Sequence, residues 1–287
     1  MRWRQSRESQ NVQDYRGRST GGGGGGGGGR GGLKLGLGGI VIAVIAYFVG
    51  GPELVMSLLS GAGSPTQTEA PVAAGSPQDD GGQFVSRVLG DTEDTWSAIF
   101  QQAGRQYPQP NLVLFEQGIN TGCGGATSAA GPFYCPADNK VYIDLAFFRQ
   151  LETDFAAQGD FAKAYVIAHE VGHHVQTVTG ISEKVRGAQG RASEAEQNAL
   201  QVRMELQADC YAGIWAHHAD RSRQLVEAGD IDEALGAANA VGDDTIQRRV
   251  QGNVNQETFT HGSGAQRQEW FKRGFASGRV DDCDTFK

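Results

Sequence analysis

Residues 161–176, FAKAYVIAHEVGHHVQ, constrain the fold of this chain more than any other stretch. Their apolar residues recur at steps of three and four, which predicts a helix with one buried face. On that helix His169 and His173 would lie about 40° apart around the axis, so both imidazoles leave from one face. Two nitrogen donors at this spacing can reach one tetrahedral metal ion, with Glu170 beside it. The stretch therefore predicts a metal-binding helix.

The pattern His-Glu-x-x-His is typical of zinc hydrolases, in which the glutamate takes a proton from a metal-bound water. The alternative is a helix that carries two ordinary surface histidines. The long apolar residues around the motif favour the metal site, because the charge of Glu170 needs a reason to lie in a mostly apolar helix. We therefore expect Glu170 to be the general base.

The third ligand decides the class of site, because a catalytic zinc takes three protein ligands and keeps one position for water. His174 is rotated by about 100° from His173 and cannot share the site. The metzincin pattern would need a glycine and a histidine where this chain has Gln176 and Thr179. The third ligand must therefore lie elsewhere in the chain.

A second helix offers that ligand in the segment MELQAD, residues 204–209. Glu205 follows far enough after the histidines for the chain to turn and return. Asp209 lies one helical turn further on the same face, where it can accept the free N–H of a ligating histidine. The alternative is a solvated helix face, but two carboxylates at this spacing repel, and a cation would relieve the repulsion. We expect Zn²⁺ on His169, His173 and Glu205.

These two motifs, HEVGH and ELQAD, resemble the gluzincin signature. The wider sequence, including YCPADNKVYIDL and THGSGAQRQEWFKRGF, resembles the bacterial putative neutral zinc metallopeptidase family over nearly all of its length. The resemblance implies a membrane-anchored zinc peptidase that cleaves a peptide or protein substrate. It also implies that strand 140–144 offers its edge to an extended substrate, the alternative being a strand that only supports the sheet.

A second resemblance concerns the stretch that begins THG at Thr260. It is similar to the Thr-His-Pro stretch of membrane proteases related to the CaaX prenyl protease, where a nearby residue steadies the oxyanion. The similarity implies this role for His261 and, more weakly, for Arg267. Glycine replaces the proline here, and the alternative is a loop histidine that caps the last helix.

The architecture implied is an α+β fold: a mainly α-helical, zincin-like domain with a small β-sheet. Residues 84–287 are expected to form this single peptidase domain. The segment 118–138, between the two expected strands, holds Gly, Ser, Pro and two cysteines and is expected to be a loop that has room for one short strand. The expected strands cover 111–115 and 140–144, and the expected helices cover about 84–105, 146–157, 161–176, 193–219, 230–240, 243–251 and 265–276.

The N-terminal part differs in composition from the rest. Residues 1–32 are basic and then glycine-only, which predicts a disordered cytoplasmic tail. The 17 residues 35–51 carry no charge, and with LVMSLL after them they predict a single transmembrane anchor within 33–60. A cleaved signal peptide and a buried core helix are the alternatives. Residues 61–83 are expected to be a flexible linker.

The positive charges before the apolar stretch would keep residues 1–34 in the cytoplasm and place the domain across the bacterial inner membrane. The formal net charge is −8 although this tail is basic, so the remainder is acidic, which argues against nucleic acid as a partner. The rival function is a membrane-tethered binding or scaffold protein with a structural zinc. A zinc hydrolase of non-peptide amides is a third possibility.

Four cysteines are present, and none belongs to a Cys-x-x-Cys pair. In a domain outside the cytoplasm, Cys123–Cys135 and Cys210–Cys283 are the natural disulfides. The two other pairings and free buried thiols are the alternatives, because spacing alone does not fix connectivity. Cys210 would lie about 140° around its helix from Glu205 and should not face the metal.

Overall fold

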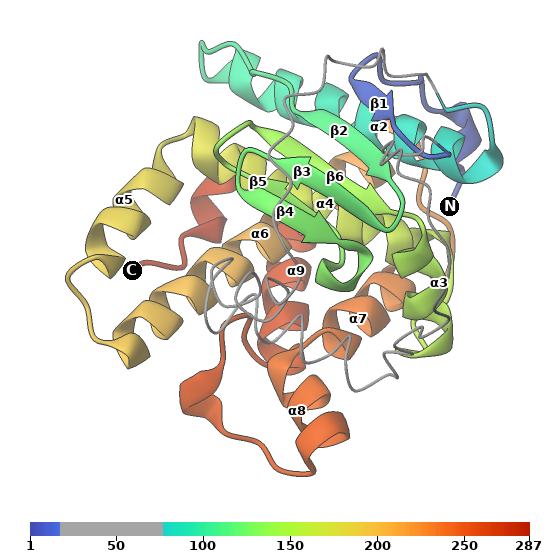
Figure 1. Ribbon diagram of the computed structural model, residues 1–287. Helices are drawn as coiled ribbons and strands as arrows, with labels where there is room; N and C mark the ends of the chain where they lie inside the picture. The colour runs from blue at the N-terminus through green and yellow to red at the C-terminus, as the bar shows by residue number, and fades with distance from the viewer. Residues whose placement is uncertain (18–76) are drawn as a thin grey trace, which may run out of the picture.

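The computed structural model describes residues 1–17 and 77–287 (Figure 1). The expected anchor at 33–60 lies outside the described residues, as does most of the expected linker. The described helices, with four short 3₁₀ turns among them, are α2 (Asp80–Gln102), α3 (Ala146–Thr153), α4 (Asp160–Val178), α5 (Ile181–Gln189), α6 (Glu194–Arg223), α7 (Asp230–Ala240), α8 (Asp243–Gln251), α9 (Gly264–Ser277), η1 (Trp3–Gln5), η2 (Ser128–Ala130), η3 (Gln256–Thr258) and η4 (Val280–Cys283).

The β-structure consists of a four-stranded sheet with the order β1-β2-β6-β5 and a separate β3–β4 hairpin. Strands β1, β2 and β6 run parallel, and β5 runs antiparallel to β6. The expected strands 111–115 and 140–144 are β2 and β6 with these bounds, so both are confirmed. The strands are β1 (Val12–Asp14), β2 (Asn111–Phe115), β3 (Gly118–Thr121), β4 (Gly124–Thr127), β5 (Phe133–Cys135) and β6 (Lys140–Asp144).

The two faces of the sheet are both covered. Leu112 and Leu114 of β2 join the main core with the helices, whereas Val113 and Phe115 belong to a smaller cluster on the other face. The β3–β4 hairpin, which lies over the sheet in Figure 1, packs against that second cluster. Burial on both faces explains why β2 is a continuous apolar run rather than an alternating one. The mainly helical α+β class with a small sheet is thus confirmed.

Three helices form the scaffold of the molecule: α4, α6 and α9. The backbones approach closely where a glycine lies between them, since a Cβ on Gly172 of α4 would be 3.0 Å from the Ala208 carbonyl oxygen of α6. A Cβ on Gly274 of α9 would be 1.9 Å from the Cys210 carbonyl oxygen. These approaches bring the side chains of three helices that are distant in sequence to one place.

Helix α6 begins where the sequence predicts. Ser193 and Glu196 form the reciprocal capping box that the pattern indicated, which satisfies two amide groups at the helix start. The helix continues to Arg223, one turn beyond the expected end. There Arg223 is held by Asp91 of α2, with 2.7 Å between Nη2 and Oδ1. This contact between two distant helices is not visible in the local sequence.

The expectation of a disordered N-terminal tail is wrong for residues 1–17. Strand β1 pairs with β2, with Gln13 opposite Val113. The indole N–H of Trp3 donates to Asp160 at the start of α4, at 2.9 Å. The expectation failed because β1 is too short to show periodicity, and because the basic residues of the tail find acidic partners on the domain.

The same pairing bears on the expected placement of the chain across the membrane, which stays a prediction. Neighbouring strands of one sheet lie in one compartment, so residues 1–17 cannot be cytoplasmic while the domain lies across the membrane. Arg16 also reaches Asp79, just before α2, with 2.5 Å between Nη2 and Oδ2. Within 1–17 and 77–287, no helix has both the length and the apolar character that a membrane crossing requires.

Candidate metal centre

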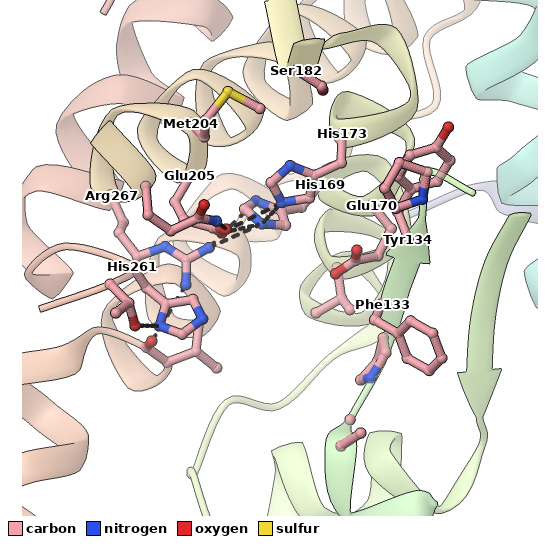
Figure 2. A pocket seen from close by; sticks show the side chains of 18 of the residues that line it. Phe133, Tyr134, His169, Glu170, His173, Ser182, Met204, Glu205, His261 and Arg267 are labelled. Carbon is pink, nitrogen blue, oxygen red and sulfur yellow. Dashed lines mark hydrogen bonds and ion pairs between the residues drawn. The ribbon is translucent and has the colours of Figure 1, made fainter. Parts of the chain in front are cut away.

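The side chains of His169 and His173 on α4 and of Glu205 on α6 converge on one point, as Figure 2 shows. His169 Nε2 lies 3.2 Å from His173 Nε2 and 3.1 Å from Glu205 Oε2. The third side of the triangle, from His173 Nε2 to Glu205 Oε2, measures 3.4 Å. The structure therefore brings together the three ligands that the two motifs predicted.

This triangle has the dimensions of a zinc site. With Zn–N and Zn–O bonds of about 2.05 Å and tetrahedral angles, neighbouring ligand atoms lie about 3.3 Å apart. The three observed separations, between 3.1 and 3.4 Å, bracket that value. The fourth corner of the tetrahedron remains for water, because the part of the chain that the structure describes offers three ligand atoms here.

The protonation of His169 follows from its neighbours. Its Nδ1 lies 2.8 Å from Asp209 Oδ1, and the carboxylate of Asp209 can only accept, so Nδ1 carries the proton. Nε2, the nitrogen that can bind a metal ion, then points to the centre of the triangle. Asp209 thus has the position expected of it, behind the first histidine, and it is fully buried.

Asp209 is itself held by two further groups. The hydroxyl of Tyr165 donates to Oδ1 at 2.5 Å. The guanidinium of Arg267 approaches from α9, with Nε 2.8 Å from Oδ2 and Nη2 3.0 Å from Oδ1. Nη2 of Arg267 also lies 3.3 Å from Nδ1 of His169. Arg267 therefore supports the carboxylate behind the metal ligand. The resemblance had implied only a weak role for it near the oxyanion.

A cation fits the chemistry of this donor set. His173 Nδ1 lies 2.9 Å from the amide oxygen of Gln176, so Nδ1 carries a hydrogen and Nε2 is the nitrogen that can bind a metal ion. Two ring nitrogens and a carboxylate oxygen then converge on one point, an arrangement that is favourable when a positive charge lies in the centre. A zinc ion supplies that charge and accepts all three lone pairs.

The charges of the site agree with a divalent ion. The carboxylates of Glu170, Glu205 and Asp209 are buried, and the guanidinium of Arg267 lies against that of Asp209. Burial lowers the pKa of His169, but Asp209 and Glu205 outweigh it and raise this pKa to about 9. The surroundings therefore stabilise positive charge at the ligands, which a proton or a metal ion can supply.

Glu170 lines the same cavity as the ligands, which has a volume of about 750 Å³. Burial raises the pKa of its carboxyl group. The lining comes from β5, α4, α5, α6 and the start of α9, and it includes apolar side chains beside the polar ones. The predicted general base thus lies in a cavity that has room for a substrate segment.

His261 also lines this cavity, from the loop before α9. Asp243 holds the residue in place, because its carboxylate accepts the backbone N–H of His261 at 2.6 Å and lies 3.0 Å from the ring Nδ1. The same carboxylate accepts the backbone N–H groups of Thr260 and Gly262. The loop that carries His261 is therefore fixed beside the metal ligands.

The strand at the edge of the cavity differs from the one expected. Strand β6 (residues 140–144) lies between β2 and β5, so the expectation that it offers a free edge to substrate is wrong. The edge strand is β5, and its Phe133 and Tyr134 line the cavity. A short strand within 118–138 was among the expectations, but the three residues of β5 gave too little pattern to place it.

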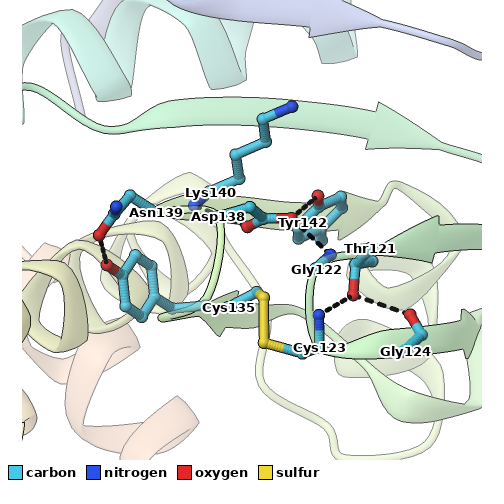
Figure 3. The surroundings of a disulfide bond; sticks show 10 residues. Thr121, Gly122, Cys123, Gly124, Cys135, Asp138, Asn139, Lys140 and Tyr142 are labelled. Carbon is cyan, nitrogen blue, oxygen red and sulfur yellow. Dashed lines mark hydrogen bonds between the residues drawn. A yellow bond between two sulfur atoms is a disulfide. The ribbon is translucent and has the colours of Figure 1, made fainter.

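The disulfide Cys123–Cys135 fixes β5 to the turn between β3 and β4 (Figure 3). The pair Cys210–Cys283 joins α6 to the C-terminal turn η4. Both expected pairings are confirmed, and no free cysteine is present. As expected, Cys210 is taken up in this bond rather than facing the metal ligands.

Sequence reasoning did not identify the glutamines of the site. Gln176 reaches the second histidine, and the side-chain amide of Gln201 donates to Glu205 Oε1 at 2.9 Å. Each lies one helical turn from the ligand that it contacts. That spacing was a usable signal, but glutamines at this spacing are common on solvent-exposed helix faces.

Comparisons with known proteins agree with the geometry. The family described as "Putative neutral zinc metallopeptidase" matches residues 1–286. The uncharacterized protein YpfJ of Escherichia coli K12 is 47% identical over 289 residues, which cover 100% of this chain and 99% of that protein. The uncharacterized protein Rv2575 of Mycobacterium tuberculosis H37Rv is 44% identical over 218 residues, 72% of either chain. No solved structure matches the chain.

Proposed function

The chain belongs to the putative neutral zinc metallopeptidase family, and from this premise we propose that it is a zinc-dependent peptidase. The observation that carries the proposal is the convergence of three ligand atoms beside the buried carboxylate of Glu170. A structural zinc site has four protein ligands and no need of an adjacent base. Three ligands with a base beside them are the composition of a hydrolytic site.

When bound, zinc supplies a Lewis acid that acidifies water and polarises a carbonyl group. His169, His173 and Glu205 would hold it. The carboxylate of Glu170 accepts the proton of the attacking water and delivers it to the nitrogen of the leaving amine. Its raised pKa suits both transfers, since the group must gain and then lose a proton. His261 is positioned to donate to the carbonyl oxygen of the substrate.

A peptide is the substrate class that the cavity suits best. Strand β5 is an edge strand, and an edge strand offers unpaired backbone groups to an extended chain. Phe133 and Tyr134 are neighbours along it, and Phe133 belongs to the smaller apolar cluster against which the β3–β4 hairpin packs. Pairing along β5 would lay a substrate backbone across the cavity that Glu170 lines.

We assign the domain to the outer face of the inner membrane, with the apolar stretch in 33–60 as a membrane attachment that both begins and ends on that face. Support for this assignment comes from the two cysteine pairs, because disulfides persist in oxidising compartments. The apolar stretch has the composition of a membrane segment. Residues 1–17 lie on the same side as the domain, since β1 belongs to its sheet.

The decisive substitution is Glu170→Gln, which keeps the size of the side chain and removes its basicity. We expect full zinc content and a loss of at least about 100-fold in the cleavage of casein, because general base catalysis contributes at least that much. Metal analysis and a fluorescent casein assay measure the two quantities on the same preparation.

The matched control is Glu257→Gln, which makes the same change at an exposed position and should leave cleavage unchanged. A Glu170→Gln protein that cleaves casein as fast as wild type would remove Glu170 from the mechanism. A wild-type protein that holds zinc but hydrolyses neither casein nor small amides would support the rival function, a tethered binding protein with a structural zinc.

A further inference from the structure

We propose that two buried glutamines, Gln176 and Gln207, form an amide relay that orients the metal ligand His173 and ties it to the disulfide-bonded residue Cys283. The relay would make the retention of zinc depend on the Cys210–Cys283 disulfide. This inference rests on the proposed zinc site, but the two glutamines themselves lie outside the catalytic machinery.

The relay consists of consecutive hydrogen bonds. Gln176 Oε1 lies 2.9 Å from His173 Nδ1. The amide nitrogen of Gln176 donates to the backbone carbonyl of Met204 at 2.7 Å and to Gln207 Oε1 at 3.1 Å. The amide nitrogen of Gln207 then donates to the backbone carbonyl of Cys283 at 3.0 Å. The relay therefore runs from a metal ligand on α4, through α6, to the C-terminal turn.

Two backbone carbonyls fix the direction of both amides. A carbonyl oxygen can only accept, so the NH₂ group of Gln207 must face Cys283 and that of Gln176 must face Met204. The side-chain oxygen of Gln176 then faces His173, and that of Gln207 faces the NH₂ group of Gln176. A flipped Gln176 would place two carbonyl oxygens against each other at 2.7 Å and its NH₂ group against the ring of His173.

The direction of the amides determines the tautomer of His173. The oxygen of Gln176 requires a hydrogen on Nδ1, which leaves Nε2 as the lone pair for the metal. His169 has a carboxylate, a tyrosine and an arginine that support it, whereas His173 depends on this amide. A histidine ligand whose second nitrogen loses its partner typically binds metal about 10- to 100-fold more weakly.

Burial prevents water from replacing the relay. The exposed fractions are 0% for Gln176 and 4% for Gln207. A buried amide that loses its hydrogen-bond partner cannot replace it with water. The loss of one hydrogen bond in the relay therefore disturbs the orientation of the next side chain. The C-terminal end of the relay is held by the disulfide, which joins Cys283 to Cys210, one turn after Gln207 on α6. Without that bond η4 loses its covalent attachment to α6.

The first test measures zinc affinity by competition with a chromophoric chelator, on the full chain. Gln176→Met has a similar shape and no amide, and we expect it to weaken zinc binding about 10- to 100-fold. Gln207→Met should act in the same direction with a smaller effect. Gln247→Met is the matched control. The side-chain amide of Gln247 is also buried and makes two hydrogen bonds, but its partners are Thr258 and Asn255, away from the metal ligands.

A further variant separates a local effect from misfolding. Gln176→Glu keeps an acceptor for the ring N–H of His173 but has no donor for the Met204 carbonyl, so its zinc affinity should lie between wild type and Gln176→Met. The visible spectrum of the cobalt-substituted protein should change in Gln176→Met and remain as in wild type in Gln247→Met. Thermal unfolding of the metal-free proteins reports whether each variant is folded.

The second test compares the two disulfides. The double variant Cys210→Ala/Cys283→Ala should lose zinc affinity, whereas Cys123→Ala/Cys135→Ala should keep it, because that pair holds β5 and not the relay. Wild-type affinity in a folded Gln176→Met protein, or in the Cys210/Cys283 double variant, would overturn the relay. A wild-type chain that binds no zinc would instead overturn the proposed function, and the relay with it.

Discussion

Arg267 is a buried cation whose partner is the carboxylate behind the first metal ligand. Its side chain is 4% exposed and Asp209 is fully buried, so neither charge can be solvated if the other is removed. The pairing holds Asp209 ionised, because the guanidinium and His169 lower its pKa against the effect of burial. The arginine therefore contributes both to the stability of the fold and to the tautomer of His169.

Replacement of Arg267 by methionine tests this pairing. Breaking one side of a buried ion pair costs about 3–5 kcal/mol, so we expect Arg267→Met to lower the free energy of unfolding by that amount. Urea denaturation of the metal-free protein measures it. The double variant Asp209→Asn/Arg267→Met should regain part of the loss, because no uncompensated charge remains. A single variant as stable as wild type would contradict the assignment.

Most of the site was predictable at the residue scale, since His169, Glu170, His173, Glu205 and Asp209 follow from spacing on two helices. Spacing within a helix determines which side chains share a face. A metal ion needs ligands from both helices, so the two faces that carry ligands must lie against each other. The sequence could not show Arg267 on Asp209, nor the amide of Gln176 on Met204. Those contacts depend on how closely α9 and α6 approach, which tertiary packing decides.

At the scale of elements, the crossing of α6 and α9 is the tightest feature of the fold. Gly274 of α9 lies against the backbone of Cys210, one residue after Asp209. The close approach is what allows Arg267, two turns earlier on α9, to reach the metal-binding face of α6. A larger residue at this crossing would move the arginine as well as the helix.

The expected outcome for Gly274→Ala is a loss of stability of at least about 1–3 kcal/mol, the usual cost of overpacking. A Cβ there would lie 1.9 Å from a carbonyl oxygen, so one helix must shift. Gly236→Ala on α7 is the control, because its Cβ meets nothing within 4 Å. The control should gain up to about 1 kcal/mol from helix propensity. Thermal unfolding measures both variants, and changes in melting temperature of the same sign would contradict this interpretation.

The helices and the two long strands were predictable because each carries enough residues to show a period or a cap. Helix α6 is an example, with the capping box at Ser193 and Glu196 marking its start. The edge strand β5 was not predictable, because three residues show no alternation. Its identity depends on its antiparallel pairing with β6 and on the disulfide at Cys135.

At the scale of the whole molecule, the N-terminal strand determines how the chain can be arranged about a membrane. Composition suggested a tail, because basic residues without periodicity are typical of disordered segments. The partners of those residues are acidic groups far along the chain, such as Glu93, which lies 2.8 Å from Arg7. Local composition cannot reveal pairings over this sequence distance.

We expect residues 1–17 and the domain to be accessible from the same side of the membrane. The test inserts a protease cleavage site after Gly17 in one chain and after Gly104 in another, both being exposed positions. Protease added to sealed spheroplasts should cut both chains, and protease added to inverted vesicles should cut neither. Lysed cells are the control for cleavability. Cleavage of the two sites from opposite sides would disprove the β1–β2 pairing in the cell.

The ion pair between Arg16 and Asp79 has a consequence for release of the domain by proteolysis within residues 18–76. The residues on either side of 18–76 are close together, because Arg16 and Asp79 form this ion pair and β1 is held in the sheet of the domain. Excision of the intervening residues would therefore free a nicked, two-chain particle that retains its amino-terminal strand. Such a particle should stay together in gel filtration and separate only in denaturant.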